Sequence, residues 1–217
     1  MLLINGTEKL FAGFVLLDCA PVQAECLALF SAASTENRLK HLDGFRGAAF
    51  FASTCGRFVL EYVLWANSAA LAAARAAPIF FEHIRIAEAH AAVRFVSFSS
   101  MYEGFGVAGM PCVRGDRFSA AIYKPRVPQP PAVTLDHLRA APALAGHNSL
   151  LLMSEDGVSA VLLAGDAIDP GVASALSSIF GEPEFRDDFV VVESITAPRE
   201  SERFDPPYHL APASAQT

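Results

Sequence analysis

The chain has 217 residues, of which 53% are hydrophobic and 18% are charged, a composition typical of a well-packed globular protein rather than a disordered one. Its formal net charge is −7, and lysine and arginine form no cluster along it. We therefore expect no nucleic-acid partner, because binding phosphates requires a cationic surface.

The apolar stretch at residues 10–17 predicts a buried strand rather than a signal or membrane segment. It is too short to span a bilayer, and Glu8, Lys9 and Asp18 flank it. None of the four cysteines stands in a spacing that suits zinc: Cys19, Cys26, Cys55 and Cys112. We therefore expect free thiols in a reducing, cytoplasmic compartment, with no membrane partner and no metal.

The order of apolar and turn patterns in residues 1–105 predicts a first lobe. Its expected elements are a strand at 14–20, a helix at 22–33, hairpin strands at 48–52 and 58–65, a helix at 68–91 and a strand at 93–102. The hairpin turns at Cys55-Gly56, and its second strand ends in Trp65, the only tryptophan of the chain. This order is βαββαβ, as in ferredoxin-like domains.

Residues 106–117 are rich in glycine and predict a linker to a second lobe at 118–198. The expected elements of this lobe are a strand at 118–123, an extended connection at 125–131, a helix at 136–143, hairpin strands at 147–154 and 158–165, a helix at 173–180 and a strand at 189–195. The two hairpin turns align with a constant offset of 101, which sets Cys55-Gly56 on Asp156-Gly157. We interpret this as a structural repeat. Residues 199–217 predict a flexible C-terminal tail.

The repeat predicts how the two lobes associate. A four-stranded antiparallel sheet that carries helices on one face leaves its other face bare, and two bare faces can close on each other. The expected fold class is therefore α+β, with two ferredoxin-like βαββαβ lobes forming an intramolecular, pseudo-dimeric α/β barrel. A homodimer of the two-lobe chain is compatible with this arrangement.

Alternation along the strand at 58–65 predicts a candidate site. Successive side chains of a strand point to opposite faces, so Glu61 and Trp65 share one face. We expect that face to line a cavity between the lobes. The aligned positions of the second lobe hold Leu162 and Asp166, so the first lobe is expected to carry most of the polar chemistry.

Three features together resemble the antibiotic-biosynthesis-monooxygenase family of dimeric α/β barrels, here as a tandem two-lobe version. They are Gly44-Phe45, the strand that ends in Trp65, and the helical segment from Pro78 to His83. The resemblance extends over residues 12–103. It implies a cofactor-independent monooxygenase acting on a small aromatic or quinol-like compound, in which the substrate's own carbanion activates dioxygen.

The resemblance also implies roles for particular residues. The substrate would stack near Trp65, Glu61 would act as a general base, and Arg85 or His83 would stabilise the anion. Many members carry an asparagine, whose amide stabilises an oxyanion, where this chain has Glu61. The chain therefore departs from the family pattern at this position.

Two other functions remain open. The first is a non-catalytic protein of the same fold that binds a small molecule. The second is a haem-binding or haem-degrading relative that uses Trp65 and His83, although the first strand lacks the asparagine of such relatives. Each residue also has an ordinary structural explanation, such as a core position for Trp65 or an ion pair between Glu61 and Arg94.

Overall fold

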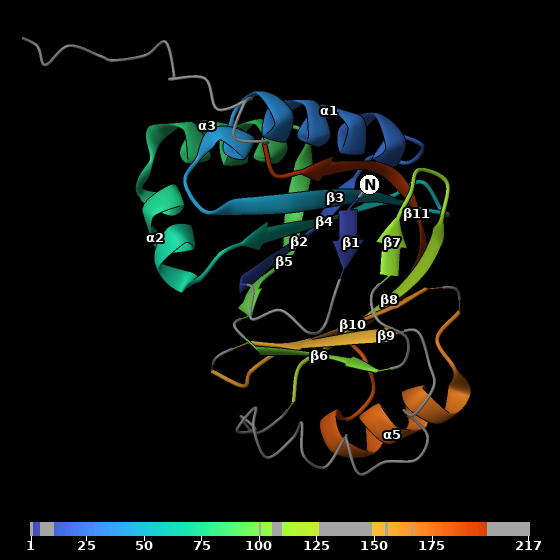
Figure 1. The fold of residues 1–217 in the computed structure, drawn as a ribbon. Coiled ribbons are helices and arrows are strands. Elements are labelled where there is room, and N and C mark those ends of the chain that lie inside the picture. The colour runs from blue at the N-terminus through green and yellow to red at the C-terminus, as the bar shows by residue number, and fades with distance from the viewer. Residues whose placement is uncertain are drawn as a thin grey trace, which may run out of the picture.

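The computed structural model describes residues 2–4, 11–99, 101–105, 110–125, 149–154, 156–165 and 167–198, and this part of the chain is α+β (Figure 1). Its strands are β1 (Leu2–Ile4), β2 (Phe11–Cys19), β3 (Phe45–Ser53), β4 (Phe58–Trp65), β5 (Ala91–Ser99), β6 (Met101–Phe105), β7 (Met110–Cys112), β8 (Arg117–Tyr123), β9 (Ser149–Met153), β10 (Ala160–Gly165) and β11 (Phe185–Thr196). Its helices are α1 (Ala24–Asn37), the short 3-10 helix η1 (Leu39–His41), α2 (Ser68–Ala76), α3 (Pro78–Glu88) and α5 (Pro170–Phe180).

The first half of the chain has the predicted βαββαβ order. Its strands lie side by side as β5-β2-β4-β3, and every pair is antiparallel. Helices α1 and α3 cover one face of this sheet (Figure 1). The strand predicted at 14–20 and the hairpin predicted at 48–52 and 58–65 are present close to their predicted bounds. The strand predicted at 93–102 is instead divided into β5 and β6, which pair with different strands.

The helix predicted at 68–91 is instead two helices, α2 and α3, with Ala77 between them. Pro78 is the first residue of α3, and Ala77 has extended backbone angles, φ −76° and ψ 135°. Proline disfavours the helical conformation of the residue before it, so the chain turns at this point. Asn67 starts α2, since its side-chain oxygen accepts a hydrogen bond from the amide of Ala70 at 2.8 Å.

The second half repeats the strand order of the first. Its strands lie as β11-β8-β10-β9, again antiparallel, with α5 packed against them. Asp169 caps α5 by accepting hydrogen bonds from the amides of Gly171 and Val172. The helix predicted at 136–143, most of the connection at 125–131, Asp166 and the tail at 199–217 lie outside the described residues.

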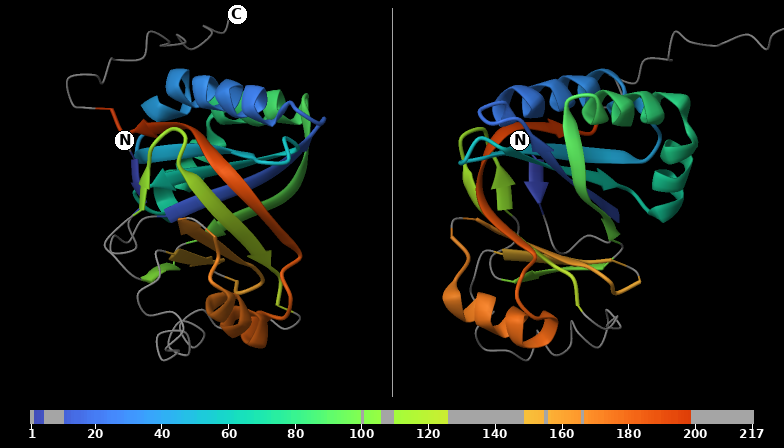
Figure 2. Two further views of the ribbon diagram at one scale, coloured as in Figure 1. Left: turned by 90° about the vertical axis from the view of Figure 1, so that its right-hand side faces the viewer. Right: turned by 180° about the vertical axis from the view of Figure 1, so that it is seen from behind.

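Two strand pairings join the halves into one nine-stranded sheet. The long strand β11 pairs with β8 through its first part and with β3 through its second part, and Figure 2 shows it running from one half to the other. At the other end, β6 pairs with β9, and only residue 100 separates β6 from β5. The predicted linker at 106–117 contains β7, which pairs with the unpredicted strand β1.

Buried apolar residues form three clusters. One lies between the two halves and includes Phe14, Tyr62 and Phe118. A second lies between the first half's sheet and its helices, and a third lies between the second half's sheet and α5. Both faces of the sheet are therefore covered. Among the described residues, no helix is long and apolar enough to cross a membrane.

Candidate active site

A cavity of about 590 Å³ lies between the outer face of the first half's sheet and helices α2 and α3. Strands β2, β4 and β5 form its floor, and the two helices form its wall. Most of the lining side chains are apolar. The charged or titratable lining residues are Glu61, Arg75, His83 and Glu88.

The position of this cavity corrects one expectation. Glu61 and Trp65 do share a face of β4 and line the same cavity, as alternation predicts. However, that face looks toward α2 and α3, whereas Leu60, Tyr62 and Leu64 face the other half. The cavity therefore lies within the first half and not between the two halves. The space between the halves is filled by the apolar cluster around Tyr62.

Glu61 is a buried carboxylate with incomplete hydrogen bonding. Only 3% of the residue is exposed, and Oε1 has no hydrogen-bond partner among the described residues. Oε2 lies 3.9 Å from Nε2 of His83, close enough for an ion pair but too far for a direct hydrogen bond. A buried acceptor without a partner is costly, so an oxygen kept in this state is a candidate for binding or catalysis.

His83 lies on α3 and connects Glu61 to α1. It is 3% exposed, and its Nδ1 lies 3.0 Å from Oγ of Ser34. The two ring nitrogens of histidine have different roles, and a partner at one nitrogen determines what the other offers. Ser34 thus orients the ring and leaves Nε2 directed at Glu61. Ser34, His83 and Glu61 are thus placed next to one another by α1, α3 and β4, respectively.

Trp65 is both a core residue and part of the cavity lining. Only 1% of it is exposed, and its ring packs edge-on against Phe45, with centroids 5.8 Å apart. It lies four residues after Glu61 on the same face of β4 and lines the same cavity. An indole at this place offers a rigid apolar surface for an aromatic ring.

The structure places Arg85 away from the cavity. This residue is exposed on α3 and does not line the cavity. Arg75, on α2, lines the cavity instead. The sequence carried a signal for it, because Arg75 is the only charged residue of the alanine-rich helix.

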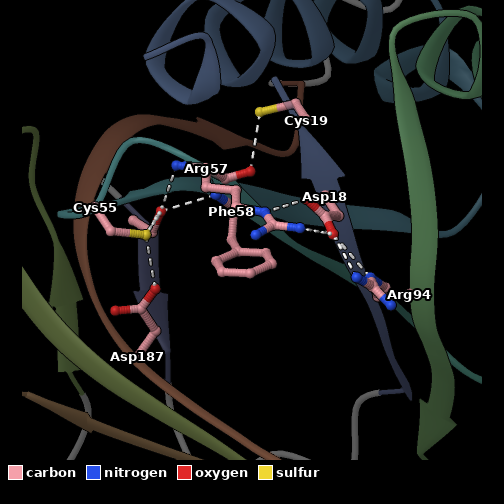
Figure 3. Close-up of polar contacts among 8 residues, drawn as sticks. Asp18, Cys19, Cys55, Arg57, Phe58, Arg94 and Asp187 are labelled. Atoms are coloured by element: carbon pink, nitrogen blue, oxygen red, sulfur yellow. Dashed lines mark hydrogen bonds and ion pairs between the residues drawn. The ribbon is translucent and has the colours of Figure 1, made fainter. Parts of the chain in front are cut away.

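The proposed structural pairing of Glu61 with Arg94 does not occur. Arg94 instead donates to Oδ2 of Asp18 at 2.8 Å, and Arg57 donates to both carboxylate oxygens of Asp18 at 2.7 and 3.0 Å (Figure 3). The Arg57 hydrogen bonds are the main reason that the pKa of Asp18 lies below its usual value. Arg94 and Arg57 therefore neutralise Asp18 and not Glu61.

The cysteines differ in exposure: Cys19 and Cys112 are buried, and Cys26 and Cys55 are exposed. All four cysteines are free thiols, and burial raises the pKa of Cys112 to about 12, so it stays protonated at neutral pH. No group of three or more histidine, cysteine, aspartate or glutamate side chains in the described part of the chain lies close enough to hold a metal ion.

The equivalent space in the second half is filled. Leu162, which aligns with Glu61, is fully buried in the cluster between the sheet and α5. Leu176 and Phe180 of α5 pack into the same cluster. The position aligned with Glu61 is therefore part of an apolar core in the second half.

No protein-family model matches the sequence, and no curated protein matches it. Solved structures do match the fold. An anthrone oxidase-like protein superposes with a TM-score of 0.65 at 13% identity, and the match covers 95% of this chain and 100% of that one. A candidate monooxygenase of Lactobacillus acidophilus NCFM gives a TM-score of 0.52 at 9% identity, over 88% of this chain and 97% of that one.

A third match has a comparable extent. A candidate monooxygenase of Fusobacterium nucleatum gives a TM-score of 0.55 at 6% identity, over 88% of this chain and 95% of that one. What these proteins share with this chain is the fold. It extends through both halves, since each match covers most of the chain.

Proposed function

We propose that this protein is a monooxygenase-like enzyme that deprotonates a small aromatic or quinol-like compound in the cavity of the first half. The observation that carries the proposal is Glu61, a buried carboxylate with an unpartnered oxygen in a mostly apolar cavity. Trp65 supplies a flat apolar surface beside it, and His83 lies 3.9 Å away. These are the parts that removal of a proton from an aromatic compound requires.

The chemistry proceeds in balanced steps. Glu61 takes a proton from a benzylic or hydroxyl position, and the resulting anion reduces dioxygen, so that a carbon–oxygen bond forms as a hydroperoxide. Loss of water from the hydroperoxide breaks the oxygen–oxygen bond and leaves a ketone or quinone. In sum, a methylene carbon and dioxygen give a carbonyl and water. The substrate is the reductant, so the proposal requires no flavin, metal or haem.

His83 is assigned to proton handling rather than to binding haem iron. Its Nδ1 faces Ser34 at 3.0 Å and its Nε2 faces Glu61 at 3.9 Å. Both ring nitrogens are directed at side chains, which supports a role in proton transfer. His83 can instead stabilise the charged form of Glu61 or receive the proton that Glu61 takes.

We also propose that the two halves close into one pseudo-dimeric barrel. The matching strand orders of the halves support this, together with the pairing of β3 with β11 and of β6 with β9. Strands β5 and β6 stand at the two ends of the strand order yet are consecutive in the chain. The apolar cluster between the halves would be the interior of the barrel.

Oxygen uptake tests the proposed reaction. The probes are 1,8-dihydroxyanthrone, chosen because one structural neighbour is named anthrone oxidase-like, and 1,4-naphthohydroquinone. Glu61→Gln should lower kcat by about 10²–10⁴-fold, the usual contribution of a general base. Binding measured by quenching of Trp65 fluorescence should change little, because the amide has nearly the same shape.

The matched control is Glu193→Gln, which changes a half-buried carboxylate on β11, away from the cavity. This variant should keep wild-type turnover. Unchanged turnover in Glu61→Gln would show that Glu61 is not the base. Binding of the probes without oxygen uptake by the wild-type protein would favour the non-catalytic binding function.

A further inference from the structure

A second cavity, of about 480 Å³, adjoins the first. The two share lining residues on α2 and β5: Leu71, Ala72, Arg75 and Val96. The remaining wall of the second cavity is largely polar and includes Ser68, Ser97, Ser154, Asp156 and Ser159. Three of these residues belong to the segment between β9 and β10, so the second half contributes to this cavity.

The polar wall is held in place by hydrogen bonds. Ser97 on β5 and Ser159 of the second half are both buried, and their hydroxyl oxygens lie 3.0 Å apart. The amide of Ser159 donates to Oγ of Ser154 at 3.0 Å, which fixes the turn between β9 and β10. This turn lies on the same side of the molecule as α2 (Figures 1 and 2). The second cavity is therefore organised before any ligand enters.

The charges around the second cavity favour neither an anionic nor a cationic group. Asp156 is exposed, and a hydrogen bond with Ser154 holds the pKa of its carboxyl below its usual value, so it is ionised at neutral pH. A singly charged group would be attracted by one of Asp156 and Arg75 and repelled by the other, so the two side chains together give no net preference for either sign of charge. Hydroxyl groups can donate to Asp156 and accept from Arg75 or Ser68. The wall thus matches an uncharged group that carries several hydroxyls.

We propose that the two cavities form one binding site for an aromatic compound that bears an uncharged, polyhydroxylated substituent such as a hexose. The aromatic ring occupies the first cavity beside Glu61 and Trp65, and the substituent passes Arg75 and reaches the turn between β9 and β10. This inference rests on the proposed function of the first cavity. It assigns the second half a role in choosing the substrate.

The test compares two probes on the full chain, 1,5-dihydroxynaphthalene and its mono-β-D-glucoside, which keeps one free phenol. Affinities are measured by calorimetry and by quenching of Trp65 fluorescence. We expect the glucoside to bind wild-type protein at least about fivefold more tightly than the parent phenol, since it adds hydrogen bonds to a prepared wall.

The decisive variant is S68A/D156N. The asparagine keeps an oxygen for the 3.1 Å hydrogen bond from the amide of Val158, so the turn should remain intact. We expect the preference for the glucoside to fall below about twofold, while the affinity for the parent phenol stays within about twofold of wild type. The control is Asp116→Asn, at a second turn aspartate, whose carboxylate accepts from the amide of Val113 at 2.9 Å away from both cavities. This variant should keep the wild-type preference.

Two results would overturn the inference, and they are distinguishable. If the parent phenol binds and the glucoside binds no better, or if S68A/D156N keeps the preference, the second cavity does not hold the substituent, and the proposed function of the first cavity stands. If neither probe binds, both the inference and the proposed function fail.

Discussion

The two halves share one strand order but treat the space between sheet and helix differently. In the first half, α2 and α3 leave a cavity over Glu61, whereas in the second half α5 packs directly over Leu162. The helix side chains account for the difference. Helix α2 is mostly alanine, while α5 presents Val172, Leu176 and Phe180. Small side chains leave space that a protein interior otherwise fills, so the composition of α2 contributes to the cavity over Glu61.

The largest effect on the free energy of unfolding is expected when the carboxylate and the leucine are exchanged at the aligned positions 61 and 162. Leu162→Glu would bury a carboxylate without a partner and should lower the free energy of unfolding by about 3–5 kcal/mol. Glu61→Leu should change it by less than about 1 kcal/mol or raise it, because a buried carboxyl group with an unpartnered oxygen is replaced by an apolar group. Urea denaturation at pH 7 measures both. Equal losses of stability in the two variants would show that the surroundings of Glu61 and Leu162 do not differ.

Truncating one leucine of each half should give a smaller difference. Leu176→Ala in the filled core should cost about 3–4 kcal/mol, because it opens a new cavity. Leu71→Ala should cost only about 1–2 kcal/mol, since one side of Leu71 already borders the cavity. Chemical denaturation monitored by circular dichroism gives both values. A larger loss for Leu71→Ala would contradict the assignment of an open space over β4.

Glycine substitutions separate backbone strain from steric overlap. Gly44 has φ +82°, and an added Cβ would lie 2.3 Å from Cβ of Ala70 on α2. Gly181, at the end of α5, has φ +84° but open space around it. Gly44→Ala should therefore cost about 2–3 kcal/mol and Gly181→Ala about 1 kcal/mol. Thermal unfolding compares them, and adding Ala70→Gly should restore part of the first loss only.

The smallest effect concerns acid stability. The pKa of Asp18 is lowered in the folded protein, so its ion pairs stabilise the fold above the unfolded-state pKa of about 3.9 and lose this contribution as pH falls further. Asp18→Asn should therefore be less stable than wild type at pH 6, with a difference that shrinks below about pH 4. Urea midpoints at pH 6, 4 and 3 provide the measurement. A difference that is independent of pH would assign the effect to packing.

Alternation along β4 was enough to place Glu61 and Trp65 on one face, because a strand has a fixed period of two. It could not decide which face meets the helices. Val59 and Val63 on one side are as apolar as Leu60 and Leu64 on the other, since the sheet is covered on both faces. The cavity was therefore expected on the wrong side of the sheet.

The helical part of the site was less predictable for a geometric reason. Treating residues 68–91 as one helix ignored the change of direction at Pro78. That break decides which side chains reach the cavity, so Arg75 lines it and Arg85 does not. The contact between His83 and Ser34 joins residues 49 positions apart and leaves no local pattern in the sequence.

Strand β11 has a consequence for how the protein is made. Its second part is the hydrogen-bonding partner of one edge of β3, yet 131 residues separate the end of β3 from the start of β11. At about 5–20 residues per second, a ribosome would deliver β11 on the order of ten seconds after β3. Until then the β3 edge has unpaired amides and carbonyls, which other chains can bind. Newly made protein should therefore depend on chaperones most strongly while β11 is still being synthesised.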